Sequence, residues 1–140
     1  MKFYQNELRL EPYPRGFHII THQIVASASQ LGTINSGMLQ VFIKHTSASL
    51  TINENADPTV RDDFESHLNV MVPENAPYYL HDYEGSDDMP AHIKSSLMGA
   101  SVMIPISNGK LNLGIWQGIY LCEHRNYASG RNLVLSYFGV

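Results

Sequence analysis

The residues best suited to chemistry are concentrated between His81 and Ser96, a stretch that reads HDYEGSDDMPAHIKSS. It holds two histidines, four acidic side chains and a lysine within sixteen residues. Imidazoles with carboxylates bind zinc and similar metals, whereas acidic pairs with carbonyl oxygens suit magnesium. The eleven-residue gap from His81 to His92 matches no compact metal motif, so spacing alone permits a metal without requiring one. The other interpretation is an acidic loop followed by an ordinary surface helix.

Two further polar clusters lie elsewhere in the chain. They are His45-Thr46-Ser47 with Asn53 and Glu54, and Gln117, Glu123 and His124. The first cluster follows a predicted strand, and the end of a rigid strand is a good position for functional side chains. Its alternative interpretation is a Ser/Thr-rich bend. A nucleophile centred on Ser47 is not favoured, because the Gly-x-Ser-x-Gly turn that exposes such serines is missing.

A helix is predicted to follow the acidic loop. Asp88 is expected to be its N-cap, Pro90 lies in its first turn, and Gly99 can end it. This arrangement places His92 and Lys94 in the first turns of the helix. The N-terminus of a helix favours anions, so Lys94 and this helix start would suit a phosphate group.

The same pattern of an acidic cap and a proline predicts a second helix over 58–71, which begins after Asp57 and ends before Pro73. A shorter helix is expected between Thr21 and Gly32. The connection 73–87 is long for a compact domain, and such loops are often functional.

Strands outnumber helices in the sequence pattern. The apolar and alternating runs predict strands over 2–10, 17–20, 37–44, 50–54, 101–106, 111–124 and 132–138. Asn108-Gly109 lies between two apolar runs and predicts a two-residue hairpin turn. The expected fold is a single α+β domain over 1–140, with an antiparallel two-layer β-sandwich or barrel-like sheet and two to three helices.

Composition narrows the function classes. The net charge is −4 and no basic block is present, which argues against a nucleic-acid partner. Cys122 is the only cysteine, so an intrachain disulfide is excluded. The first residues show no signal sequence, and no apolar run reaches membrane-spanning length. We therefore expect a cytoplasmic protein without a membrane partner.

Long runs of the sequence closely resemble the YjbQ family of small bacterial and archaeal proteins. These runs are HTSASLTINENADPTVRDD, HDYEGSDDMPAHIKSSLMGASVMIPISNGKL and LGIWQGIYLCEHR. The resemblance covers nearly the whole chain. It implies a compact α+β domain with two β-layers, a homotrimer, and a His/Asp pocket that holds a divalent metal, zinc or magnesium. It also implies activity as a secondary thiamine-phosphate synthase.

The resemblance also implies roles for individual residues. The expected metal ligands are His45, His81 and His92. The expected catalytic residues are His45, Glu54, Asp88 and His92, and the expected substrate-binding residues are Thr46, Ser47, Asn53, Lys94, Gln117 and Glu123.

Three functions follow as hypotheses. The first is a transferase that joins hydroxymethylpyrimidine diphosphate to thiazole phosphate and releases diphosphate, whose charge a divalent cation and Lys94 would neutralise. The second is a metal-dependent hydrolase or lyase of a small phosphorylated metabolite, with metal-bound water as nucleophile. The third is a module that binds a metal or small ligand without catalysis.

Overall fold

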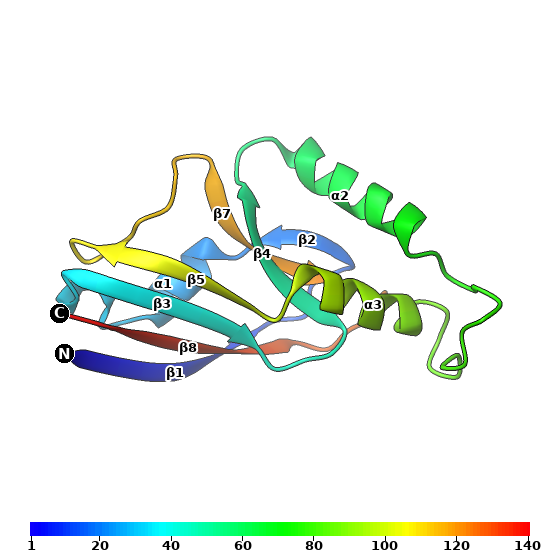
Figure 1. Cartoon of the computed structure of the whole chain (residues 1–140), viewed down its shortest axis with the longest axis horizontal. Coiled ribbons are helices and arrows are strands. Elements are labelled where there is room, and N and C mark those ends of the chain that lie inside the picture. The colour runs from blue at the N-terminus through cyan, green and yellow to red at the C-terminus, as the bar shows by residue number, and fades with distance from the viewer.

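The computed structural model describes residues 1–140 and contains two antiparallel β-sheets (Figure 1). The strands are β1 (Lys2–Leu10), β2 (Gly16–Ile19), β3 (Ser36–Ile43), β4 (Ala48–Glu54), β5 (Ser101–Ser107), β6 (Lys110–Leu111), β7 (Gln117–Glu123) and β8 (Arg131–Gly139). The five-stranded sheet has the order β1-β8-β3-β5-β6, and the three-stranded sheet has the order β2-β7-β4. The α+β class with two antiparallel β-layers is therefore confirmed.

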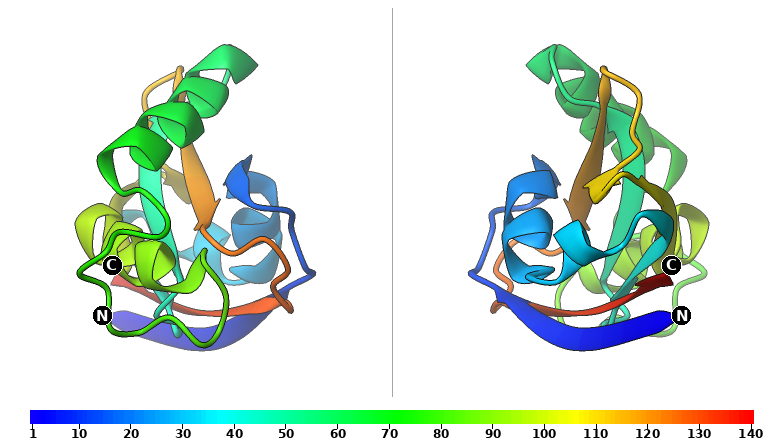
Figure 2. Two further views of the ribbon diagram at one scale, coloured as in Figure 1. Left: turned by 90° about the vertical axis from the view of Figure 1, so that its right-hand side faces the viewer. Right: turned by 90° about the vertical axis from the view of Figure 1, so that its left-hand side faces the viewer.

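The main hydrophobic core lies between the two sheets. Along β8 every second side chain is buried, because successive residues of a strand point to opposite faces. Leu133 and Leu135 of this strand share one core cluster with Leu121 of β7 and Leu50 of β4. In Figure 2 β1 and β8 form the bottom of the molecule with no helix beneath them, so the outer face of the five-stranded sheet has no covering layer.

The three-stranded sheet is buried on both faces. Ile119 and Leu121 of β7 point into the main core, whereas Tyr120 and Cys122 belong to a second apolar cluster that includes Leu68 of helix α2 (Pro58–Met71). This explains why β7 appears in the sequence as a continuous apolar run rather than an alternating one. Cys122 is fully buried and unpaired.

The helices are α1 (Thr21–Ser27), α2 (Pro58–Met71) and α3 (Asp88–Met98), with a short 3₁₀ turn, η1 (Leu31–Thr33). Both predicted ends of α2 are confirmed, and the Asp57 side chain accepts a hydrogen bond from the Thr59 N–H at 2.9 Å. The predicted end of α3 is also confirmed, because Gly99 adopts a φ of +110° that favours glycine. The connection between α2 and α3 contains neither helix nor strand, as expected.

The Asn108-Gly109 hairpin is confirmed. Both residues have positive φ, 52° and 74°, and Ser107 pairs with Lys110 across the turn. The strand predicted over 111–124, with a pause at Gly114, is wrong as a single strand, because β6 ends at Leu111 and the chain crosses to the other sheet before β7 begins.

Two details of the helix starts also differ from the predictions. Asp87, not Asp88, precedes α3, and its side chain makes no capping hydrogen bond because it pairs with an arginine instead. Helix α1 is shorter than expected, and Thr21 does not cap it, because its hydroxyl accepts the Ile119 N–H of β7 at 2.9 Å. None of the helices is both long and apolar enough to span a membrane.

Candidate metal centre

Three side chains converge at the start of α3. The Nε2 atoms of His81 and His92 lie 2.7 Å and 3.3 Å from Oδ2 of Asp88. The three potential ligand atoms all lie within 4.8 Å of one another. Two imidazole nitrogens and one carboxylate oxygen form the three-ligand set of many catalytic zinc sites, in which water or substrate takes the fourth position. We refer to His81, Asp88 and His92 as the triad.

Thr46 determines which nitrogen of His92 faces the triad. The His92 Nδ1 lies 3.0 Å from the Thr46 carbonyl oxygen, and a carbonyl can only accept a hydrogen bond. Nδ1 therefore carries the proton, and in a neutral ring Nε2 directs its lone pair at the Asp88 carboxylate. Two electron-rich atoms at this distance repel each other unless a cation or a second ring proton lies between them. Metal-binding histidines are commonly held through their other ring nitrogen in this way.

Arg125 holds the other side of the Asp88 carboxylate. Its Nη1 lies 2.6 Å from Asp88 Oδ1, its Nε lies 2.9 Å from Asp87 Oδ2, and its Nη2 donates to the Glu84 carbonyl oxygen. Burial by itself would raise the pKa of Asp88, but the hydrogen bond from His81 and the charge of Arg125 bring this pKa below its ordinary value. The proton that His81 Nε2 donates to Asp88 is the one that a bound metal would displace. Asp88 is therefore ionised and oriented, which is the state that a metal ligand requires.

Local sequence explains how the triad assembles. Asp88 and His92 are four residues apart on α3 and therefore lie on the same face of the helix. The Ser95 hydroxyl donates to the Ala48 carbonyl oxygen at 2.8 Å, which fastens α3 to the start of β4. His81 comes from the end of the long connection, where the ring of Tyr83 packs edge-on against it.

Two hollows flank the triad. The hollow on the His81 side has a volume of about 340 Å³, and its lining includes Tyr79, Asp82 and Ser86. The hollow on the His92 side has a volume of about 550 Å³ and is lined by His45, Thr46, His92, Ser95, Ser96, Gly99 and Ala100. No lysine or arginine lines either hollow.

His45 lies beside the triad but is not part of it. It lines the larger hollow together with His92 and Thr46. Its Nε2 accepts a hydrogen bond from the Asn132 N–H at 2.7 Å, which uses the lone pair that a metal would need. Of the three expected histidine ligands, the structure therefore brings together His81 and His92, and Asp88, not His45, offers the third potential ligand atom.

Several expected substrate-binding residues lie in the interior. Lys94 is only 1% exposed and donates to Asn69 Oδ1 at 2.7 Å, so it faces α2 and not a phosphate site. Burial lowers the pKa of Lys94, and the nearby Arg15 lowers it further. Glu123 is fully buried and forms a two-pronged ion pair with Arg131, whose Nη2 also donates to the Ser47 hydroxyl.

Asn53, Glu54 and Gln117 form a separate group at the opposite end of the three-stranded sheet. Glu54 pairs with Gln117, at one end of the β4–β7 ladder, and Ala48 pairs with Glu123 at the other. The triad belongs to the second end, because Thr46 and Ala48 hold α3 there. The expected single pocket is therefore divided between two regions of one chain.

His124 occupies a buried position next to the site. Its Nε2 lies 2.7 Å from the Ser49 hydroxyl oxygen, and its Nδ1 is buried without a hydrogen-bond partner. Burial lowers the pKa of His124 to about 3, so the ring is neutral at physiological pH. The sequence pattern did not indicate this pair, because Ser49 and His124 meet only through the pairing of β4 with β7.

Arg125 was not among the expected site residues. Its only sequence signal was its place in a short segment with Arg131, which is too sparse to indicate an anion-binding patch. The structure gives each arginine a carboxylate partner, Arg125 at the triad and Arg131 in the interior.

The fold and the site define a small α+β protein with a candidate His/Asp metal centre. A family model described as UPF0047 protein YjbQ-like matches residues 6–140. The UPF0047 protein YjbQ of Salmonella typhimurium is 50% identical over 137 residues, which cover 98% of this chain and 99% of that protein. UPF0047 protein YugU of Bacillus subtilis is 42% identical over 104 residues, which cover 74% of this chain and 76% of the relative. The chain belongs to the YjbQ (UPF0047) family.

Solved structures agree with this assignment. A YjbQ/UPF0047 family protein from Clostridium acetobutylicum superposes with a TM-score of 0.84 at 39% identity, covering 95% of this chain and 99% of that chain. A YbjQ-like protein of unknown function from Sulfolobus solfataricus P2 has the same TM-score at 22% identity, which shows the shared fold. The family and fold are therefore established, and the function has to be argued from the site.

Proposed function

We propose that this protein binds a divalent transition metal at the triad and uses it in a reaction of a small phosphorylated metabolite. The observation that supports the proposal is the convergence of His81 Nε2, His92 Nε2 and Asp88 Oδ2 within 4.8 Å of one another. The proton on His92 Nδ1 adds to this support, because it leaves Nε2 free to bind a metal.

The donor set favours zinc over magnesium. Magnesium is usually bound through carboxylates, water and phosphate oxygens, whereas two of the three candidate ligands here are imidazoles. When bound, such an ion supplies Lewis acidity, which can activate water or neutralise the charge of a leaving phosphate group.

The chain's own residues would prepare the site for that ion. Thr46 sets the tautomer of His92, and Arg125 keeps Asp88 ionised and fixed in orientation. The hollow beside His92 is lined by the hydroxyl groups of Ser96 and Thr46, which can donate hydrogen bonds to phosphoryl oxygens, whereas the Ser95 hydroxyl already donates to Ala48.

Two reactions fall within this class, and the family resemblance suggests the first. In a thiamine-phosphate synthase reaction, the thiazole nitrogen attacks the pyrimidine methylene carbon. The new C–N bond replaces the C–O bond to diphosphate, which leaves with the bonding electron pair. In a hydrolase reaction, water forms a new P–O bond at phosphorus while the P–O bond to the metabolite breaks, and the departing metabolite oxygen takes up the proton that the water gives up. In a lyase reaction, the C–O bond to phosphate breaks, phosphate leaves with the bonding electron pair, and a proton is lost from the neighbouring carbon. The second type is favoured by the interior position of Lys94, because the cation expected to receive the diphosphate is not available at the site.

Metal analysis and enzyme assay test the proposal. Protein purified without chelators is expected to contain about one zinc or related ion per chain, because a complete structural or catalytic site binds one metal. His92→Ala should lose this metal, whereas His67→Ala, which removes an exposed histidine on α2, should retain it.

Incubation with both thiamine precursors then separates the two reactions. Thiamine phosphate as product supports the synthase, and release of phosphate or diphosphate from a single substrate supports the hydrolase or lyase. Absence of metal from the wild-type protein, with no gain on adding zinc, would disprove the metal site. Bound metal without turnover of any phosphorylated substrate would leave only a binding module.

We also propose that the protein forms a homotrimer. Large apolar side chains are exposed, including Leu80 at 95% in the connection before α3 and Ile115 at 82% in the segment before β7, and such surfaces commonly mark protein contacts. Light scattering during size-exclusion chromatography tests this proposal, with an expected mass of three times the 15.7 kDa of one chain. The mass of a single chain would refute it.

A further inference from the structure

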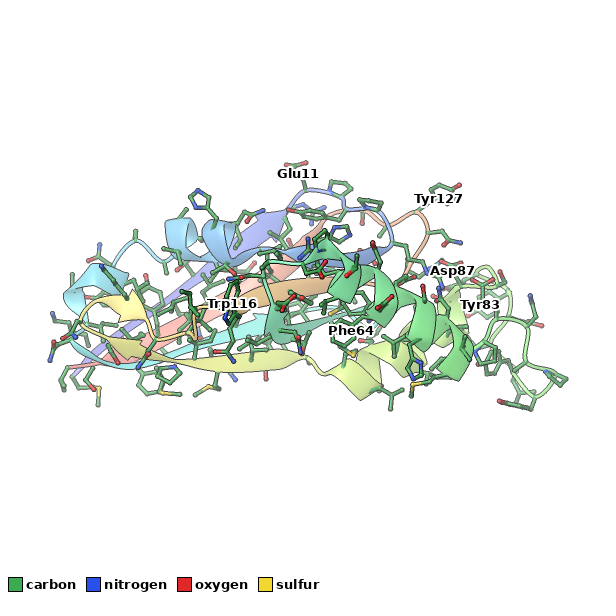
Figure 3. All side chains as sticks on the ribbon, turned by 90° about the horizontal axis from the view of Figure 1, so that it is seen from above. Glu11, Phe64, Tyr83, Asp87, Trp116 and Tyr127 are labelled. Carbon is green, nitrogen blue, oxygen red and sulfur yellow. The ribbon has the colours of Figure 1, made fainter.

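Asn53, Glu54 and Gln117 lie far from the triad. Six residue steps separate the two ends of β4, and a strand rises about 3.3 Å per residue, so Glu54 lies roughly 20 Å from the triad end. Figure 3 shows this separation along the long axis, with Trp116 well removed from Asp87 and Tyr83. Side chains at this distance cannot act on one small molecule within one chain.

Asn53, Glu54 and Gln117 line a hollow of their own. Its volume is about 320 Å³, and it is lined by Ile52, Asn53, Glu54, Trp116 and Gln117. We refer to it as the Gln117 hollow.

Local hydrogen bonds hold the polar groups of the Gln117 hollow in place. Gln117 Oε1 accepts the Gly114 N–H at 2.8 Å, and Glu54 Oε2 accepts the Asp57 N–H at 3.2 Å. These bonds occupy one side-chain atom each. Gln117 Nε2 and Glu54 Oε1 therefore have no partner within the chain and are available to a ligand.

The hollows beside the triad offer the Asn75 amide and hydroxyl groups such as those of Thr46 and Ser96, but no positively charged donor. No lysine or arginine lines the hollows beside the triad, and Arg125 is already paired with Asp87 and Asp88. The side-chain amide of Gln117 can donate to phosphoryl oxygens. Arg61, in the first turns of the adjacent helix α2, has a buried Nη1 without a hydrogen-bond partner. The groups that would bind a phosphorylated substrate are therefore divided between the triad and the end of the three-stranded sheet that carries the Gln117 hollow.

The two ends also expose different apolar surfaces. The long connection at the triad end presents Leu80 and Tyr83, which are 95% and 78% exposed. The opposite end presents Ile115 and Trp116, which are 82% and 62% exposed. Two unlike surfaces on one chain suit head-to-tail association, in which one end of each copy contacts the other end of the next and the ring can close.

We infer that a second copy of this chain completes the site, with the Gln117 hollow of one copy placed against the triad of its neighbour. The inference rests on the proposed function for the role of the triad. It makes Gln117, Asn53 and Glu54 substrate-binding residues that act across a subunit boundary. It also explains why they belong to the same expected pocket as His92 although the fold separates them.

Cross-linking tests the contact independently of any chemistry at the metal. Tyr83→Cys and Trp116→Cys are mixed and treated with a short bis-maleimide, and the native Cys122 is buried and should not react. The expected product is a covalent dimer that contains one copy of each variant, identified by intact mass. Glu11→Cys replaces Trp116→Cys in the control, because Glu11 lies on an edge away from both ends (Figure 3). Failure of the first mixture to give more mixed dimer than the control overturns the inference.

Complementation tests the shared site. His92→Ala removes a triad ligand, and Gln117→Glu removes the amide donor while keeping an oxygen for the Gly114 N–H. In the presence of zinc, each variant alone should bind no inorganic diphosphate in calorimetry. An equimolar mixture that is unfolded and refolded together should regain about a quarter of the wild-type sites, because each of two neighbours is intact at its contributing end with a probability of one half.

The outcomes separate this inference from the proposed function. Diphosphate binding by Gln117→Glu alone, or no recovery in the mixture, overturns the shared site. If Gln117→Glu does not fold, as judged by circular dichroism, Glu54→Gln takes its place, since it keeps an oxygen for the Asp57 N–H. If wild-type protein binds neither zinc nor diphosphate, the proposed function fails, and the cross-link alone then decides whether the two ends meet.

Discussion

Replacing Arg131 by methionine would leave a buried carboxylate without its counter-charge. Arg131 Nε and Nη2 lie 2.7 Å and 2.5 Å from the two carboxylate oxygens of Glu123, whose side chain is fully buried. The same Nη2 donates to the carbonyl and the hydroxyl of Ser47, so the guanidinium also joins β8 to the segment before β4. The substitution removes all four contacts and leaves the carboxylate in a medium that solvates charge poorly.

The expected loss follows from that geometry. Removing one partner of a buried ion pair costs about 3–5 kcal/mol, a large part of the roughly 5–15 kcal/mol that stabilises a typical domain. With a urea m-value of about 2 kcal/mol/M, the unfolding midpoint should fall by roughly 2 M. Urea titration followed by far-ultraviolet circular dichroism measures this shift.

Two further variants test whether the stability loss comes from leaving a buried carboxylate unpaired and not from breaking any ion pair. The double variant Glu123→Leu/Arg131→Met should recover most of the stability, because it removes both charges. Lys44→Met breaks the exposed pair between Lys44 and Glu7, and it should cost at most about 1 kcal/mol. If Arg131→Met is as stable as wild type but loses metal-dependent activity, Glu123 acts at the site, as the sequence suggested, and the structural account is wrong.

Three other substitutions test the triad, the buried His124 and the end of helix α3. Arg125→Gln should weaken zinc binding about 10- to 100-fold in a chelator competition, because the group that orients a ligating carboxylate is lost; unchanged affinity would remove Arg125 from the centre. Stability should fall as pH drops from 6.5 towards 3, because unfolded His124 takes up a proton near its ordinary pKa of 6.5, whereas in the folded protein its pKa is about 3. Urea titrations at several pH values should therefore show a flatter profile for His124→Gln, and an equal slope would exclude this cause. Gly99→Ala should cost about 1–3 kcal/mol through its positive φ alone, since a Cβ there meets no atom within 4 Å. Gly32→Ala, equally open but without positive φ, should unfold at nearly the wild-type temperature.

The fold was predicted best where a local signal determines the structure. Helix α2 has an acidic cap, a proline in its first turn and a proline beyond its end, and its observed bounds agree with the prediction. The Asn108-Gly109 turn requires positive φ at both positions, which few other residue pairs supply. Where no such signal exists the prediction failed, as at 111–124, because a strand that changes sheets has the same local pattern as one that continues.

The site was predicted in part for the same reason. Asp88 and His92 share a helix face through their spacing, and His81 lies close by in the chain, so the sequence could bring these three residues together. Arg125 reaches them only because β7 ends beside the start of α3, a relation that no local pattern records. The division of Asn53 and Gln117 from the triad is likewise a property of the β4–β7 register.

Lys94 shows why residue type alone misplaced a substrate contact. Its position on α3 suggested a phosphate ligand, yet Lys94 Nζ and Arg15 Nη2 both donate to the same oxygen, Oδ1 of Asn69. Two cations converge on one neutral acceptor only when the surrounding fold holds them there, and Glu65 and Glu74 balance the charge by pairing with Arg15. The lysine therefore helps to join α3 to α2. Because α3 carries two of the three triad residues, this interior network serves the site by fixing where Asp88 and His92 lie and not by contact with a ligand.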